Sequence, residues 1–102
     1  MDITLQYFDG CPNWKVTRTH LETLEAEGID MSVTLHLIDT PELAAAANFR
    51  GSPTVLIEGN DPFADPDAPV GLSCRVYRTD KGYVGSPTLE QLRDAVGTAS
   101  AT

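Results

Sequence analysis

Two cysteines, Cys11 and Cys74, are the residues of this chain whose type is best suited to chemistry. Cys11 lies between a run of strand formers and an amphipathic segment, within Asp9-Gly10-Cys11-Pro12. N–H groups and the dipole at the start of a helix favour an anion, so a thiol there ionises readily and becomes a nucleophile. We therefore predict that Cys11 is catalytic. An inert cysteine in a tight turn is the alternative, since the charge of Asp9 would oppose ionisation.

A second feature is Ser52-Pro53, which leads into the apolar run at residues 54–57. A proline that opens a buried strand needs a special geometry, and a cis peptide bond is one such device. In a sheet with the first strand in the middle, the end of that strand lies beside the start of an antiparallel third strand. We therefore expect a cis-proline at Pro53, close to Cys11, and keep a trans proline as the alternative.

The elements that must position these residues follow a β-α-β-α-β-β-α order. Strands are predicted at residues 3–8, 33–38, 54–57 and 74–78, and helices at residues 12–27, 43–48 and from Thr88 onward. A strand-helix-strand unit is parallel and right-handed, and a last hairpin and helix complete the sheet. The expected fold is α/β, a central mixed sheet flanked by helices. It forms one domain over residues 1–97, followed by a flexible tail at residues 98–102.

Cys74 is expected to lie away from Cys11. If the third and fourth strands pair as a hairpin, Cys74 lies about 13 Å from Pro53, at ~3.3 Å per residue. A disulfide requires Cα atoms within about 7 Å. A bridge to Cys11 would need the acidic loop (residues 59–72) to fold back across the site. We therefore interpret Cys74 as a small buried strand residue, with a role as second thiol as the alternative.

Three motifs of this chain resemble the thioredoxin-like superfamily, and the resemblance covers the whole chain. The motifs are Tyr7-Phe8-Asp9-Gly10-Cys11-Pro12, Gly51-Ser52-Pro53-Thr54 and Gly71-Leu72-Ser73-Cys74-Arg75. They are also similar to a small bacterial group of thioredoxin-like proteins, some of which contain selenocysteine. The resemblance implies a thioredoxin-like fold with Cys11 in the place of the attacking thiol. Where thioredoxins have Cys-x-x-Cys, this chain has Trp14 in the place of the resolving cysteine.

A monothiol disulfide/thiol oxidoreductase is the expected function, in which Cys11 attacks and an external thiol such as glutathione releases it. No other cofactor is expected. Contacts to a peptide or small-thiol substrate are expected from Pro12, Asn13, Trp14, Arg50, Ser52 and Pro53. Two alternatives stay open. One is a thioredoxin-fold binding module without turnover, because the second cysteine of the motif is missing. The other is binding of a soft metal or a mercurial by Cys11, with or without Cys74.

Composition disfavours several other classes of function. The chain has 102 residues and a net charge of −8, and its basic residues are scattered, which argues against nucleic acid and anionic lipid as partners. Neither a signal peptide nor a membrane-spanning run is expected, so we predict a cytoplasmic protein. The two histidines, His20 and His36, are too few to indicate a resident metal site.

Overall fold

The computed structural model describes residues 1–100. Its elements are β1 (Asp2–Tyr7), α1 (Trp14–Ala26), β2 (Ser32–Leu37), α2 (Pro41–Ala47), β3 (Thr54–Ile57), β4 (Tyr77–Thr79), β5 (Gly82–Val84) and α3 (Leu89–Ser100). Helix α3 continues to Ser100, beyond the domain boundary expected at residue 97. Residues 101–102 of the expected tail lie outside the described residues.

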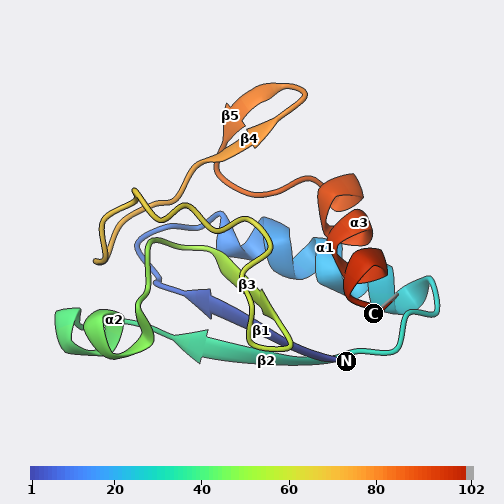
Figure 1. The fold of residues 1–102 in the computed structure, drawn as a ribbon, viewed down its shortest axis with the longest axis horizontal. Helices are drawn as coiled ribbons and strands as arrows, with labels where there is room; N and C mark the ends of the chain where they lie inside the picture. The colour runs from blue at the N-terminus through green and yellow to red at the C-terminus, as the bar shows by residue number, and fades with distance from the viewer. Residues whose placement is uncertain (101–102) are drawn as a thin grey trace.

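Strand β1 lies in the middle of a mixed sheet with the order β2-β1-β3 (Figure 1). It pairs with β2 in parallel, with Leu5 beside Leu35, and with β3 in antiparallel fashion, with Leu5 beside Val55. The prediction of a central first strand and an antiparallel third strand is therefore confirmed. This order brings the end of β1, which leads to Cys11, close to the start of β3.

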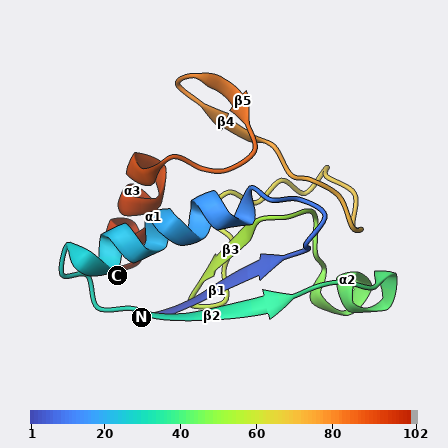
Figure 2. The ribbon, with the colours of Figure 1, turned by 180° about the vertical axis from the view of Figure 1, so that it is seen from behind.

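The hydrophobic core lies on one face of this sheet. Ile3 and Leu5 of β1 and Val55 and Ile57 of β3 point into it. They belong to one cluster with Leu21 and Leu24 of α1 and Leu92 and Val96 of α3. Full burial of side chains of this size contributes about 1.5–3 kcal/mol each. Both views show α1 and α3 on the same side of the sheet, whereas α2 lies beyond the end of β2 (Figures 1 and 2). Helices thus cover one face of the sheet.

Side-chain caps mark the starts of α2 and α3. The hydroxyl of Thr40 accepts a hydrogen bond from the N–H of Leu43, 3.1 Å away, at the start of α2. At the start of α3, Thr88 and Gln91 each accept a hydrogen bond from the other's backbone N–H, at 3.0 and 2.9 Å. This reciprocal capping box satisfies two N–H groups that the helix itself leaves unpaired.

The predicted fourth strand is wrong in both position and pairing. In the described residues, β4 pairs only with β5, and the two form a hairpin that projects from the body of the molecule (Figure 1). Residues 74–76 precede this hairpin. Cys74 pairs with Ser52, which lies just before β3, in one isolated parallel β-bridge. A parallel contact cannot belong to the tight hairpin that the sequence suggested.

Candidate functional site: a disulfide beside the end of strand β1

Cys11 and Cys74 are joined by a disulfide bond. Their Cα atoms lie 5.6 Å apart, although the two residues are 63 positions apart in the sequence. The expectation that Cys74 lies out of reach of Cys11 is therefore wrong. Its interpretation as a buried strand residue is wrong as well, because Cys74 is exposed and belongs to no strand. The physical reason is that the acidic loop does fold back across the site.

Cys11 lies in a tight turn (residues 8–13, the Cys11 turn) between β1 and α1. Its N–H donates to the carbonyl of Phe8 at 3.1 Å, which closes the turn. The carbonyl of Asn13 accepts from the N–H groups of Val16 and Thr17, so Asn13 is the N-cap of α1. Cys11 thus lies just before the helix, near its N-terminal N–H groups, and its residue is 0% exposed.

The three residues after Cys11 were expected to contact substrate, and the structure places each of them differently. Pro12 is exposed. Asn13 is half-buried against Gly85, so closely that a Cβ on Gly85 would overlap the Asn13 amide. Trp14 is half-buried and packs on Tyr7, with ring centroids 4.3 Å apart. Of these three residues, Pro12 is therefore the most exposed.

Ser52 connects the two segments that carry the cysteines. Its peptide bond to Pro53 is cis, as the sequence predicts. The Ser52 hydroxyl accepts from the N–H of Phe8 at 3.1 Å, which ties it to the Cys11 turn. Its own N–H donates to the carbonyl of Ser73 at 2.8 Å, and its carbonyl accepts from the N–H of Arg75 at 2.9 Å. The backbone of Ser52, which we expected to contact a substrate, is thus paired with residues 73–75, the Cys74 segment.

Arg75 fixes the Cys74 segment from the other side. Its side chain is 8% exposed, and it forms an ion pair with Asp61 at 2.7 Å. The guanidinium also donates to the hydroxyl of Thr54 and to the carbonyl of Phe63. It lies 4.6 Å over the ring of Tyr77. Arg75 was missed as a site residue, because its partners are far away in the sequence and form no motif.

Tyr77 completes this anchor at the start of the hairpin. Its hydroxyl donates to the carbonyl of Pro53, and its ring meets that of Phe63 edge to face, with centroids 5.5 Å apart. Burial raises the pKa of Tyr77 well above its usual value, and the nearby Arg75 opposes this only in part. The hydroxyl therefore stays protonated at neutral pH and remains a donor to the residue beside the disulfide.

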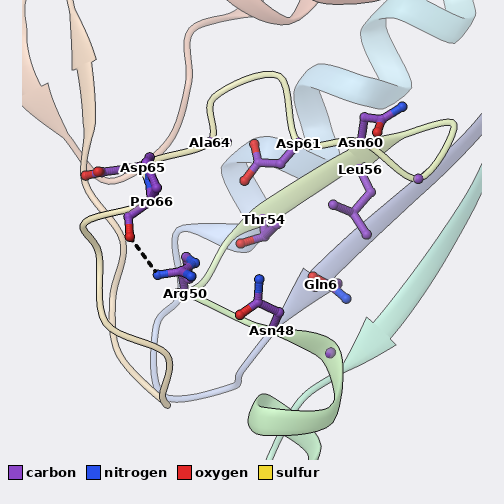
Figure 3. Close-up of a pocket in the computed structure, with 12 residues that line it drawn as sticks. Gln6, Asn48, Arg50, Thr54, Leu56, Asn60, Asp61, Ala64, Asp65 and Pro66 are labelled. Atoms are coloured by element: carbon purple, nitrogen blue, oxygen red, sulfur yellow. Dashed lines mark hydrogen bonds between the residues drawn. The ribbon is translucent and has the colours of Figure 1, made fainter.

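Arg50 binds the acidic loop. Its guanidinium donates to the carbonyls of Pro66 and Ala68, and Figure 3 shows the first of these bonds. Beside it lies a pocket of about 380 Å³ between the loop and the sheet face opposite the core. Its lining includes Gln6, Asn48, Thr54 and Asn60 (Figure 3) but neither cysteine. The predicted contact between Arg50 and a substrate therefore stays a prediction, since the guanidinium is seen bound to the loop.

Comparisons of this chain with protein-family models, with curated proteins and with solved structures found no match. None of the helices described over residues 1–100 has both the length and the apolar character needed to cross a membrane. Within the same residues, no group of three or more His, Cys, Asp or Glu side chains is placed to hold a metal ion. The chemistry of the site is consequently interpreted from the disulfide and its surroundings.

Proposed function

We propose that this protein is a thioredoxin-like thiol–disulfide exchange protein whose reactive pair is Cys11 and Cys74. The observation that supports this most is a disulfide with one exposed cysteine beside the cis-proline Pro53. Exposed disulfides are typically the labile ones, which serve catalysis or regulation. Helix α1 lacks the second cysteine of a Cys-x-x-Cys motif. Cys74 provides the second thiol instead.

The reaction is a two-electron exchange. A partner thiolate attacks one sulfur of the pair and forms a mixed disulfide, while the Cys11–Cys74 bond breaks and its electron pair stays on the other sulfur. A second partner thiolate then attacks the mixed disulfide and releases the partner in oxidised form. The protein is left with two thiols, so two partner thiols have become one disulfide. Run in reverse, the reduced protein reduces a disulfide. A small external thiol such as glutathione is a suitable partner.

The alternative functions have less support. A peptide-binding module would need the backbone edge at Ser52, and that edge is filled by Ser73 and Arg75. Soft-metal binding would use the same two sulfurs, and only after their reduction. No separate feature of the described residues favours it. Disulfide exchange therefore makes the fullest use of the observed geometry.

A turnover assay tests this proposal. Glutathione is supplied as reductant and bis(2-hydroxyethyl) disulfide as substrate, and the formation of oxidised glutathione is followed. We expect the wild-type protein to raise the rate above that of glutathione alone. The double variant Cys11→Ser/Cys74→Ser, which keeps the side-chain size, should give no increase. Equal rates with wild type and double variant would show that the disulfide is structural only.

A further inference from the structure

We propose that Cys74, and not Cys11, is the cysteine that forms the mixed disulfide with the partner, and that Cys11 is the buried thiol that resolves it. This assignment rests on the proposed exchange function and reverses the roles expected from the sequence. It concerns which of the two sulfurs a partner can reach, and it follows from an asymmetry in burial between the two ends of the disulfide.

Access distinguishes the two cysteines. Cys11 is 0% exposed, enclosed in the turn between β1 and α1. Cys74 is exposed, Ser73 before it is also exposed, and Val76 just after it is 64% exposed. Thiol–disulfide exchange requires the incoming sulfur to reach one particular sulfur of the bond, so the rate depends on access to that sulfur. A partner thiolate therefore meets Cys74 first.

The stability of the leaving thiolate also favours attack at Cys74. When a partner thiolate attacks the Sγ of Cys74, a new bond forms between these two sulfurs. The Cys11–Cys74 bond breaks, and its electron pair leaves on the Sγ of Cys11. Cys11 lies just before the N-cap Asn13 of α1, where unpaired N–H groups and the helix dipole stabilise negative charge. A thiolate whose charge is stabilised in this way leaves more readily.

In the reverse direction the same roles hold. The thiolate of Cys74 attacks a partner disulfide, and one partner sulfur leaves as a thiolate. The thiolate of Cys11 then attacks the Sγ of Cys74. The Cys11–Cys74 bond re-forms, and the second partner sulfur leaves as a thiolate. The partner has gained the two electrons that the protein has lost.

Several contacts of the Cys74 segment remain when the disulfide is cut, because they do not involve sulfur. The backbone of Ser52 still bonds to Ser73 and Arg75, and the Arg75 side chain still pairs with Asp61. Cys74 is thus an exposed cysteine that these remaining contacts hold near Cys11. Since the Ser52 edge is filled, the partner does not extend the sheet there. The site fits a small thiol or a cysteine on a flexible segment.

Two single variants of equal size test the assignment. Cys11→Ser leaves Cys74 as the only thiol, and Cys74→Ser leaves Cys11. We expect Cys74 in the first variant to react with Ellman's reagent at least about tenfold faster than Cys11 in the second. The difference should vanish in 6 M guanidinium chloride, where burial is lost. Equal rates in the native proteins, or a faster Cys11, would overturn the proposal.

Wild-type protein provides a test that does not depend on the folding of a variant. The oxidised protein is treated briefly with limiting glutathione, quenched with acid, alkylated and digested with trypsin. Cleavage after Lys15, Arg50 and Arg75 separates Cys11, in peptide 1–15, from Cys74, in peptide 51–75. Glutathione is expected mainly on peptide 51–75. An equal or larger amount on peptide 1–15 contradicts the assignment.

Failure of this inference is distinguishable from failure of the proposed function. In the turnover assay we expect Cys11→Ser to keep part of the activity through Cys74, and Cys74→Ser to lose it. Turnover that persists in Cys74→Ser and is lost in Cys11→Ser would leave the function intact and reverse the roles. Absence of turnover in wild-type protein would remove the function, while the thiol reactivities would still report which sulfur is accessible.

Discussion

The two segments that meet at the disulfide are held in place by different kinds of interaction. The Cys11 turn continues directly from β1 into α1, and main-chain hydrogen bonds such as Cys11 to Phe8 close it. The Cys74 segment belongs to no helix or strand. It is held by one parallel bridge to Ser52 and by the buried side chain of Arg75. One half of the site is thus a product of local secondary structure, and the other half depends on a few long-range polar contacts.

This difference indicates which half of the site can move. The Cys11 turn loses its shape only if β1 or α1 unfolds, which costs much of the core. The Cys74 segment is retained by the disulfide, two main-chain hydrogen bonds and the Arg75 cluster. A region with few buried apolar contacts opens at a lower free energy than the core does. Changes made on the Cys74 side therefore test the comparison most directly.

Reduction of the disulfide should have the largest effect. It removes a cross-link between residues 63 positions apart, and a closed loop of that length stabilises a protein by about 4 kcal/mol in the chain-entropy model. We expect the free energy of unfolding, measured by urea titration with and without a phosphine reductant, to fall by about this amount. The main cause is the greater entropy of the unfolded chain.

The double variant Cys11→Ser/Cys74→Ser is the control for this measurement. Its unfolding midpoint should match that of the reduced wild-type protein and should not respond to the reductant. Identical midpoints for oxidised and reduced wild-type protein would mean that the cross-link does not constrain the chain, and the contrast between the two segments would lose its basis.

Arg75→Gln should have the next largest effect. The substitution leaves Asp61, which is 20% exposed, without its cation, and it removes the donor to Thr54. Loss of one partner of a fully buried pair costs about 3–5 kcal/mol, and partial exposure of Asp61 reduces our expectation to about 2–3 kcal/mol. Hydrogen exchange should accelerate at the N–H of Ser52 and remain slow at Leu5 in the sheet.

Arg18→Gln is a matched control, because Arg18 pairs with Glu22 on the surface of α1, with both side chains more than half exposed. Such a pair contributes little, so this variant should stay within about 0.5 kcal/mol of wild type. If Arg75→Gln behaves like Arg18→Gln, the Cys74 segment does not depend on the arginine, and the anchor must lie in the backbone alone.

The same contrast explains how much of the molecule the sequence predicts. The elements with strong local signals are found where expected, such as β3 at residues 54–57 and the cis-proline Pro53. These features depend on residue type and short-range spacing. The position of Cys11 between β1 and α1 belongs to the same class, although its burial does not follow from the spacing.

The position of Cys74 could not be predicted, because no local pattern encodes it. The sequence predicts a strand at residues 74–78 and a hairpin with the strand at residues 54–57. The structure instead uses Arg50 and Arg75 to bind loop carbonyls and Asp61, which turns the acidic loop back over the sheet. Each of these contacts joins residues from separate segments. Nothing in the sequence around Arg75 indicates that its partners are Asp61 and Phe63.

The substitution Tyr77→Phe should have the smallest effect, since Tyr77 links the Cys74 side to Pro53 through one hydroxyl. The pKa of Tyr77 is raised by burial, so the folded protein keeps this proton above pH 10 while the unfolded chain releases it. The stability that Tyr77 contributes is therefore complete below about pH 10 and is lost as the pH rises. Between pH 9 and pH 11 the wild-type protein should lose about 1.4 kcal/mol more unfolding free energy than Tyr77→Phe.

The comparison with Tyr83→Phe makes this measurement specific, because Tyr83 lies on the same hairpin and is 72% exposed. That variant should follow the wild-type alkaline profile, because it leaves the bond between Tyr77 and Pro53 in place. Parallel profiles for wild type and Tyr77→Phe would mean that the hydroxyl of Tyr77 is free to ionise in the folded protein. The start of the hairpin would then not be bonded to Pro53, and the Cys74 side would be held by Arg75, the disulfide and the main-chain bonds to Ser52.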